Sequence, residues 1–351
     1  MKSLGGTSLD IGFIDGLANA VAAVMKLPAG RISDRIGRRP LVLVGYGLSA
    51  VIRPLVSFAT SPLGVLAVRA ADRFGKGLRA APRDALVTDL VEPALRGRAF
   101  GHIRAMDHAG AALGPLVATL FLLVLPGRER LLFLLAIVPG LATLAVIWRF
   151  VRDPLRRSAA PRPLTREALS RPQAMLLGCV ALWALAVSSE QFLLMRASAL
   201  GVPLALVPLV WFFMSAAKSV AARFAGPLVD RLAPRGVLIA GWLLFAVAYA
   251  GLALSDHIAL ALPLVVVVGL AYGISEPAER ALVAALATDG RQGAAFGWYA
   301  LVQGLMALPA GLLAGWLWQQ GPLGPSLAFA TTAGLVTVAS GLLAVTRRGA
   351  V

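Results

Sequence analysis

The sequence predicts an all-α integral membrane protein built from two pseudo-symmetric helical bundles. Three observations carry this prediction. Hydrophobic residues make up 58% of the 351 positions and charged residues only 14%, whereas soluble domains are roughly 45–50% apolar and about 25% charged. The apolar residues form segments of about 20 residues, which is the length that spans a bilayer as a helix. The two halves of the chain also repeat one another.

Eleven apolar segments are predicted to cross the membrane as helices. The one long polar stretch follows the fifth segment and holds six arginines and four prolines, so it is predicted to be a partly extended linker. We therefore expect an N-terminal bundle of five spans (1–150), a linker (151–172) and a C-terminal bundle of six spans (173–351). The predicted spans are 10–29, 40–59, 62–82, 98–124, 130–150, 173–197, 203–226, 235–254, 257–279, 293–318 and 324–346.

The repeat has a fixed spacing of 196 residues, and many membrane transporters are built from such repeats. At this spacing the span 173–197 has no counterpart in the first half, because its equivalent would precede Met1. Either the reading frame begins further upstream, which we favour, or the native protein lacks one helix. The matching segments are Gly30–Arg35 with Gly226–Arg231, Ala85–Val87 with Ala281–Val283, and Ala99–Gly101 with Ala295–Gly297.

The distribution of basic residues predicts the orientation. Of the 33 Lys and Arg residues, 22 flank one alternating set of turns together with the linker and the C-terminal tail, whereas four flank the other set and the N-terminus. Lys and Arg accumulate in cytoplasmic loops, so the linker and the C-terminus are predicted to be cytoplasmic, in the plasma (inner) membrane. The net charge of +16 forms no single patch, and nucleic acid is therefore not an expected partner.

Two motifs resemble those of a known family. The run Gly30–Arg39 resembles the signature loop between helices 2 and 3 of the major facilitator superfamily, and Gly110–Pro115 is similar to the glycine–proline motif that exporters of that family carry on helix 5. Arg69 stands where the family places a buried arginine. The resemblance implies a secondary transporter whose gating motif comprises Gly30, Asp34, Arg35, Gly37, Arg38 and Arg39, with Gly226, Asp230 and Arg231 in the second copy, where Ala233 replaces the motif glycine.

The chemistry of this motif is that of a state-dependent contact. Asp34 can pair with a nearby arginine or accept hydrogen bonds from the N-terminus of a neighbouring helix. A contact made in one conformation and broken in the other acts as a latch, and we favour this role over a purely topogenic one. Gly110 and Gly114 allow a neighbouring helix to approach closely, and with Pro115 they suggest a packing pivot between the bundles.

Charged residues inside the predicted spans mark a substrate or proton pathway, because lipid-facing charges are costly. Arg69, Asp72, Arg73 and Lys76 share one face of a helix and must face protein or water. A structural network, with Asp72 neutralising Arg69 or Arg73, is the alternative reading. Further candidates are the possible local pair of Arg104 with Asp107, and Glu190.

Glu190 is the first choice for proton coupling. Arg196 is the only basic residue near it in the sequence, and an unpartnered buried carboxylate can bind and release a proton. Cys179 is the only cysteine, and His102, His108 and His257 lack metal-ligand spacing, so neither a metal nor a cofactor is expected. Nothing in the sequence resembles the site of an enzyme.

We therefore expect a monomeric transporter that works by alternating access. Because no nucleotide-binding motif is present, a proton gradient, or else a sodium gradient, would drive it. Export of a small organic molecule is the leading function. The cationic stripe favours an organic anion as the alternative substrate, carried in either direction. A shortened homologue that acts as a receptor or scaffold is the third reading.

Overall fold

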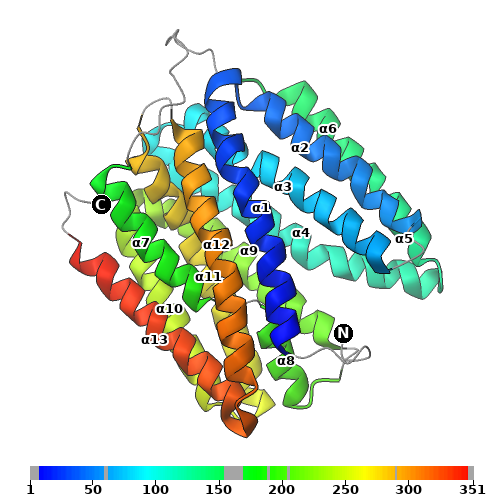
Figure 1. Cartoon of the computed structure of the whole chain (residues 1–351), viewed down its shortest axis with the longest axis vertical. Coiled ribbons are helices and arrows are strands. Elements are labelled where there is room, and N and C mark those ends of the chain that lie inside the picture. The colour runs from blue at the N-terminus through cyan, green and yellow to red at the C-terminus, as the bar shows by residue number, and fades with distance from the viewer. Residues whose placement is uncertain are drawn as a thin grey trace.

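The computed structural model describes residues 8–58, 62–153, 169–187, 190–203, 206–288 and 291–346, and within them the elements are helices (Figure 1). The helices are α1 Ser8–Ile36, α2 Arg39–Ile52, α3 Pro62–Leu90, α4 Arg96–Val124, α5 Glu129–Leu135, α6 Ile137–Phe150, α7 Arg171–Ala186, α8 Gln191–Ala199, α9 Val207–Leu232, α10 Pro234–Leu254, α11 Ile258–Leu286, α12 Gln292–Trp318 and α13 Gly324–Val345, with short 3₁₀ turns η2 Arg53–Phe58, η3 Pro93–Leu95 and η5 Gly321–Leu323.

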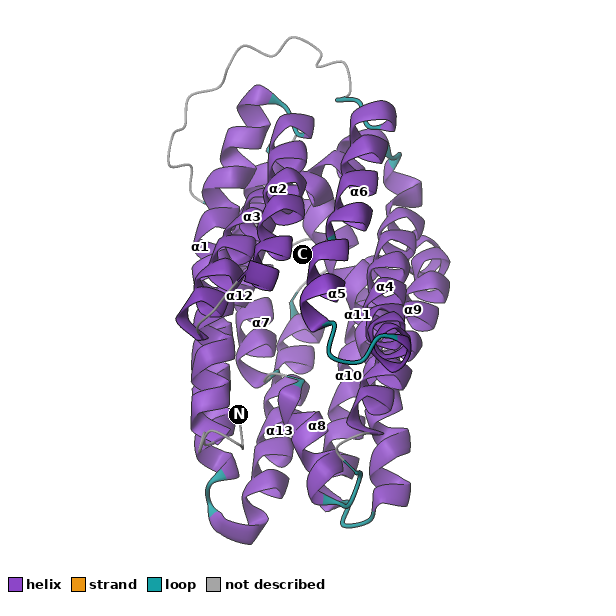
Figure 2. Cartoon of the chain, turned by 90° about the vertical axis from the view of Figure 1, so that its right-hand side faces the viewer, coloured by secondary structure: helices purple, strands orange, loops and turns teal. Residues whose placement is uncertain are grey.

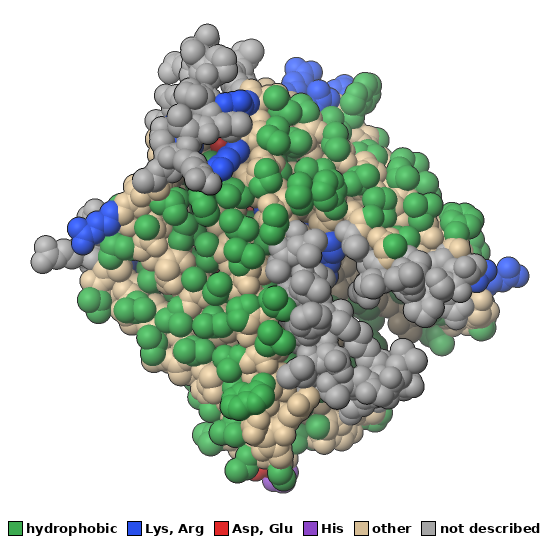
Figure 3. Space-filling model, viewed as in Figure 1, with side chains coloured by type: hydrophobic (Ala, Val, Ile, Leu, Met, Phe, Trp, Pro, Cys, Tyr) green, Lys and Arg blue, Asp and Glu red, His purple; other side chains and the backbone are tan. Residues whose placement is uncertain are grey.

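These helices account for the predicted spans. In the described residues, eight of them, some joined to a neighbouring short helix, are long and apolar enough to cross a membrane. Helices α1, α3 and α9 are not among the eight, and α3 and α9 carry charged residues along their length. Most of the helices run lengthwise in the view of Figure 2, where the loop between α4 and α5 lies at mid-height. Hydrophobic side chains cover much of the visible surface (Figure 3), as expected of a protein surrounded by lipid.

Four helices run further than predicted at the end that carries the arginines. Helix α1 continues to Ile36, α3 to Leu90, α9 to Leu232 and α11 to Leu286. The expectation that residues 30–39 form a loop is therefore wrong: most of the motif is the last part of α1, and the turn itself is confined to Gly37 and Arg38. Polarity marks where a helix leaves the membrane, but charged side chains do not end a helix.

Two predicted spans are interrupted. The span expected at 173–197 consists of α7 and α8, with Val187 at the end of α7 in an extended conformation. The span expected at 130–150 consists of α5 and α6, which meet at Ala136. A broken helix exposes backbone groups inside the membrane, which is tolerated where the break lies against protein or a cavity.

The helices form two bundles, α1–α6 and α7–α13, which meet along two seams. In one seam α1 packs beside α12, and in the other α4 packs beside α9 (Figure 1). Stacked aromatic rings fill the second bundle, where the rings of Trp183 and Trp242 lie 4.9 Å apart beside Phe245. We call the end of the molecule that carries Arg31, Arg38, Arg96, Arg231 and Arg291 the basic end.

Candidate functional site

At the basic end, Asp34 of α1 binds the N-terminus of α12. Its carboxylate accepts hydrogen bonds from the backbone N–H groups of Gly293 at 3.0 Å and of Ala294 at 2.8 Å. The first N–H groups of a helix have no partner within the helix, and the helix dipole favours an anion there. A Cβ atom on Gly30 would collide with the carbonyl oxygen of Gly293, so the glycine is required for this approach. We call this contact the first latch.

Arg38 holds the carboxylate of the first latch in place. Its guanidinium pairs with Asp34, donates to the hydroxyl of Ser33 at 2.9 Å and reaches Asp89 of α3 at 3.0 Å. The backbone N–H groups of Arg38 and Arg39 both donate to Asp153 at 2.9 Å. The motif therefore ties α1 to α2, α3 and the segment after α6 that contains Asp153, while Arg35 is exposed at the same end.

The second copy of the motif makes the same contact in the other seam. Asp230 of α9 accepts hydrogen bonds from the N–H groups of Gly97 at 2.6 Å and of Arg98 at 3.0 Å, at the start of α4. Gly226 packs against the carbonyl oxygen of Gly97, and Arg231 is exposed. Each of these residues lies 196 positions from its counterpart in the first latch. We call this contact the second latch, and it places two equivalent contacts on one end.

The substituted position in the second motif keeps the backbone shape of the first. Gly37 has φ 104°, and Ala233, its counterpart, has φ 71°; among the described residues Ala233 is the one non-glycine with positive φ. Only glycine adopts this conformation without steric cost. The turn between α9 and α10 is therefore retained at the expense of local strain.

Between the two seams, buried charges from three helices form a network. Asp84 of α3 pairs with Arg104 of α4 at 2.7 Å and with Arg280 of α11 at 3.2 Å. Asp84 and Arg280 occupy equivalent positions in the two repeats, 196 residues apart. Since each charge is paired, the network tolerates burial, and it joins the two bundles across the centre of the molecule.

The network continues along α4. Arg104 pairs with Asp107 at 3.0 Å, which confirms the predicted local pair, and Asp107 also binds Arg83 at 3.0 Å. The next residue, His108, contacts Glu276 of α11 at 2.7 Å. This contact links an imidazole in one bundle to a carboxylate in the other.

The cationic stripe of α3 has a partner on another helix. Asp72 pairs with Arg53 at the end of α2 at 3.0 Å, a partner that was not predicted, and its predicted pairing with Arg69 or Arg73 stays a prediction. Sequence spacing cannot reveal a partner on another helix. Arg73 is partly buried and Lys76 exposed, and the side chain of Arg69 lies outside the described residues.

Lys76 adjoins a second lysine. Gly77, the residue after Lys76, packs against Ala22 and Met25 of α1, and Lys26 follows Met25 in the sequence. Neither lysine forms an ion pair with a side chain that the structure describes. Two ammonium groups without an acidic partner among the described side chains can bind an anion.

Glu190 has a basic partner, contrary to prediction. It lies just before α8, at the break in the span, and pairs with Lys218 of α9. The Lys218 ammonium also lies 4.5 Å from the ring centre of Tyr272. Lys218 is 28 residues from Glu190 in the sequence, so only the fold brings them together. A paired carboxylate is a weaker candidate for proton coupling than an unpaired one.

Glu279 of α11, unlike Glu190, is a buried carboxylate whose described partners are uncharged hydrogen-bond donors. It accepts hydrogen bonds from Trp242 Nε1 at 3.1 Å, Gln303 Nε2 at 3.2 Å and the hydroxyl of Tyr299. In the described part of the chain it forms no ion pair. Glu279 lines a cavity of about 220 Å³ together with Glu276, Trp183, Tyr272, Ser275 and Gln303.

The glycine–proline motif does not mediate close packing in this conformation. A Cβ atom on Gly110 or Gly114 would meet no described atom within 4 Å, so the predicted close approach is wrong here. The close approach of α4 to α9 occurs instead at Gly97 and Gly101, where the second lies against Ala222 and Gly226. Pro115 lies within a continuous α4.

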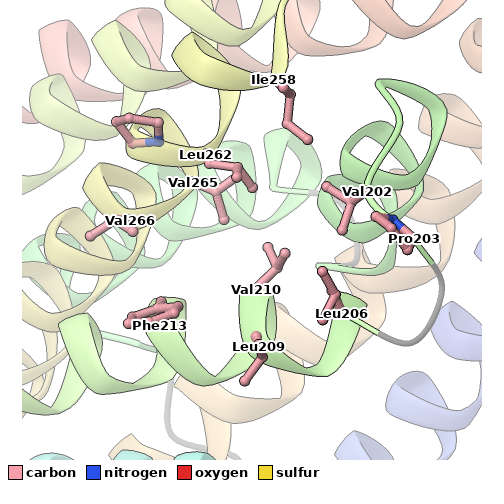
Figure 4. Close-up of a pocket in the computed structure, with 11 residues that line it drawn as sticks. Val202, Pro203, Leu206, Leu209, Val210, Phe213, Ile258, Leu262, Val265 and Val266 are labelled. Carbon is pink, nitrogen blue, oxygen red and sulfur yellow. The ribbon is translucent and has the colours of Figure 1, made fainter.

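A second cavity, of about 440 Å³, lies between α9 and α11 and beside the segment after α8 (Figure 4). Its walls are apolar side chains, among them Val202, Leu206, Phe213 and Leu262. It offers no charge or hydrogen-bonding group that could select a ligand, so we do not assign the transported molecule to it.

The chain is similar in sequence and in structure to known membrane transporters. The family model described as Major Facilitator Superfamily matches residues 1–311 and 191–349. An uncharacterized MFS-type transporter of Methanocaldococcus jannaschii is 30% identical over 98% of this chain and 87% of its own length. The multidrug resistance protein MdtH of Photorhabdus laumondii is 30% identical over 49% of this chain and 41% of its own length. The crystal structure of the human organic anion transporter MFSD10 has a TM-score of 0.80 at 18% identity, covering 96% of this chain and 84% of that one.

Proposed function

The chain belongs to the major facilitator superfamily, and from that membership we propose that it carries a small molecule across a membrane by alternating access, driven by a proton gradient. The observation that carries the proposal is the pair of latches, in which Asp34 and Asp230 close the same end through equivalent contacts. These contacts join the bundles by a few hydrogen bonds and can be broken and remade, as alternation between two conformations requires.

We place the protein in the plasma (inner) membrane, with the basic end, the linker and the C-terminus on its cytoplasmic side. The proposal is supported by the excess of Lys and Arg at that end. In the conformation described here the cytoplasmic end is then the closed one. We expect the transporter to act as a monomer, since its two bundles form the two halves that must move.

Proton coupling is supported by the His108–Glu276 contact between the bundles. An imidazole and a carboxylate that face each other across a moving boundary can exchange a proton with water when the boundary opens. Export is supported by the likeness of part of the chain to the multidrug resistance protein of Photorhabdus laumondii.

An organic anion is the second candidate for the substrate. Lys26 of α1 and Lys76 of α3 lie on neighbouring helices, and neither has an acidic partner in the described residues. A carboxylate, sulfate or phosphate group on the substrate would neutralise them. The fold that this chain shares with a human organic anion transporter is compatible with such a substrate.

Flux into proteoliposomes tests the function. A ligand-induced thermal-shift screen on purified protein selects a compound, and uptake is then measured with and without a pH gradient, against protein-free liposomes. Gradient-dependent accumulation is the expected result. Binding without any flux would refute transport and favour the receptor or scaffold reading, and accumulation that ignores the pH gradient would refute proton coupling.

A further inference from the structure

The cavity of about 220 Å³ in the second bundle lies at the C-terminal end of α7, in a setting that favours a cation. Ala184, in the last turn of α7, and Val187, where the helix stops, form part of its wall. The carbonyl end of a helix carries a partial negative charge and attracts cations. The residues that line the cavity in the described part of the chain include two acids, Glu276 and Glu279, and no base.

Of these two acids, Glu279 is the one whose charge is not matched by a neighbouring base. Glu276 contacts His108 at 2.7 Å and Arg280 at 3.8 Å. Glu279 is only 3% exposed, accepts its hydrogen bonds from uncharged donors and forms no ion pair with a described side chain. A buried carboxylate without a counter-charge is costly, so a ligand with one positive charge would complete the site.

Two polar side chains of the wall have their donors engaged elsewhere and keep oxygen atoms that can accept. Ser275 donates its hydroxyl hydrogen to the carbonyl oxygen of Ala271 at 2.8 Å. Gln303 donates its amide hydrogens to Glu279 at 3.2 Å and to the hydroxyl oxygen of Tyr299 at 2.9 Å. The hydroxyl oxygen of Ser275 and the amide oxygen of Gln303 can still accept hydrogen bonds, as can the carboxylates. These acceptors suit a ligand that donates N–H groups.

Two aromatic rings complete the wall. Trp183 and Tyr272 line the cavity with their ring centres 6.2 Å apart and their planes at 71° to each other. Aromatic faces attract ammonium groups, and the carbon atoms that an organic ammonium carries can pack on the same rings. Lys218 lies 4.5 Å from the ring centre of Tyr272, but its charge is balanced by Glu190. The rings therefore favour an organic cation over a metal ion.

The first bundle has no equivalent of this acidic wall. Three positions of α11 that line the cavity have basic counterparts on α3. At the repeat spacing of 196 residues these pairs are Tyr272 with Lys76, Ser275 with Arg79 and Glu279 with Arg83. Basic side chains repel a cation, so a cation site is expected in the second bundle and not at the equivalent place in the first.

We propose that this cavity binds an organic ammonium group of the transported molecule, with Glu279 as its counter-ion. The site would take part of the substrate, so it rests on the transport function proposed above. A cavity of about 220 Å³ is smaller than the roughly 300–1,000 Å³ that encloses a drug-sized ligand, so it takes the charged head while the rest of the molecule lies outside. An organic anion that uses Lys26 and Lys76 would fit this cavity only as a zwitterion.

Binding of n-butylammonium to the purified full chain tests the proposal. Thermal-shift titrations should show saturable stabilisation by n-butylammonium and none by n-butanol or butyrate, which differ from it mainly in the charge of the head group. Glu279→Gln keeps the shape of the side chain and should weaken binding by about 10- to 100-fold, because a hydrogen bond to a charged group is lost. Asp256→Asn is the matched control, since its carboxylate is 85% exposed and its loss should leave binding at the wild-type level.

Wild-type binding by Glu279→Gln would overturn the proposal, and so would equal stabilisation by sodium chloride at the same concentration, which would indicate a site for any small cation. A comparison with 5-aminopentanoate identifies the source of the ammonium group. Tighter binding than that of n-butylammonium indicates a zwitterionic substrate and weaker binding a simple amine, and either supports the proposal.

Gln303→Lys keeps the proposal testable if Glu279→Gln does not fold. The amide nitrogen of Gln303 lies 3.2 Å from the carboxylate of Glu279, so the lysine ammonium can reach the same carboxylate and should block n-butylammonium. Undiminished binding by this variant would also overturn the proposal. These titrations measure no flux, so their failure leaves the proposed transport standing, whereas absence of flux in the proteoliposome assay refutes that transport itself.

Discussion

Asp34→Asn should open the basic end, because it weakens the first latch without changing its shape. The asparagine oxygen can still accept one of the two backbone hydrogen bonds from Gly293 and Ala294, but the charge and one bond are lost. The side chain is only 12% exposed, so water compensates little. A hydrogen bond to a charged group contributes about 1.5–3 kcal/mol. With a loss of about 2 kcal/mol, the ratio of closed to open molecules falls roughly 30-fold.

The second latch sharpens this prediction. Asp230 makes equivalent bonds to Gly97 and Arg98, so Asp230→Asn should have an effect of the same sign and similar size. The two latches lie in different seams and share no residue, so their effects should multiply to roughly 900-fold in the double variant. Transport should fall more than the yield of folded protein in each case.

Distances between spin labels provide the measurement. Labels at Ile36 of the first bundle and at Thr288 of the second, both exposed near the basic end, should show a longer population in the variants, after Cys179 is replaced by alanine. Asp256→Asn makes the same chemical change at an exposed residue of the opposite end and should leave the distances unchanged. Wild-type distances in the double variant would refute the latch reasoning.

Two further variants test the backbone and the charge network. Ala233→Gly should raise the thermal unfolding temperature slightly, because relief of the strain from a positive φ is worth about 1–2 kcal/mol, which exceeds the entropy cost of about 0.4–1 kcal/mol for introducing glycine. Gly37→Ala, the reverse change, should lower the unfolding temperature. The opposite pattern would contradict backbone strain at Ala233. Asp84→Asn leaves Arg104 and Arg280 without their shared anion and should cost about 3–5 kcal/mol of stability. Asp107→Asn, at a side chain 40% exposed, should cost under about 1 kcal/mol, so equal losses in thermal stability would contradict the buried network.

The fold could be predicted from the sequence because hydrophobic length and internal repetition are local signals. Each predicted span corresponds to a helix or to two short consecutive ones. The ends of α1, α3, α9 and α11 could not be predicted, because hydropathy reports where a helix leaves the membrane and not where the helix itself ends. The break between α7 and α8 was not predicted either, although the polar residues Ser188, Ser189, Glu190 and Gln191 interrupt the apolar sequence there.

The pairing within the site could not be predicted, because the partners lie on different helices. Lys218, the partner of Glu190, lies on another helix and is not evident from the sequence around Glu190. Glu279 is the last residue of the predicted span 257–279, whereas α11 continues to Leu286. One signal was available. Immediately before the repeated Ala-Leu-Val segment, the first copy has Arg83-Asp84 and the second has Glu279-Arg280. Opposite charges at equivalent positions indicate residues that can meet between the two halves.

The contact between Asp84 and Arg280 requires the two repeats to differ at one equivalent position, and this bears on why both repeats are encoded in one chain. In a dimer of identical subunits, residues on the two-fold axis face their own copies, which would bring aspartate to aspartate or arginine to arginine. Like charges in a buried position repel each other. The central ion pair can therefore form only after the two copies have diverged at this position, and divergence of that kind requires that they be separately encoded. The pair makes each half complementary to the other and unable to replace it.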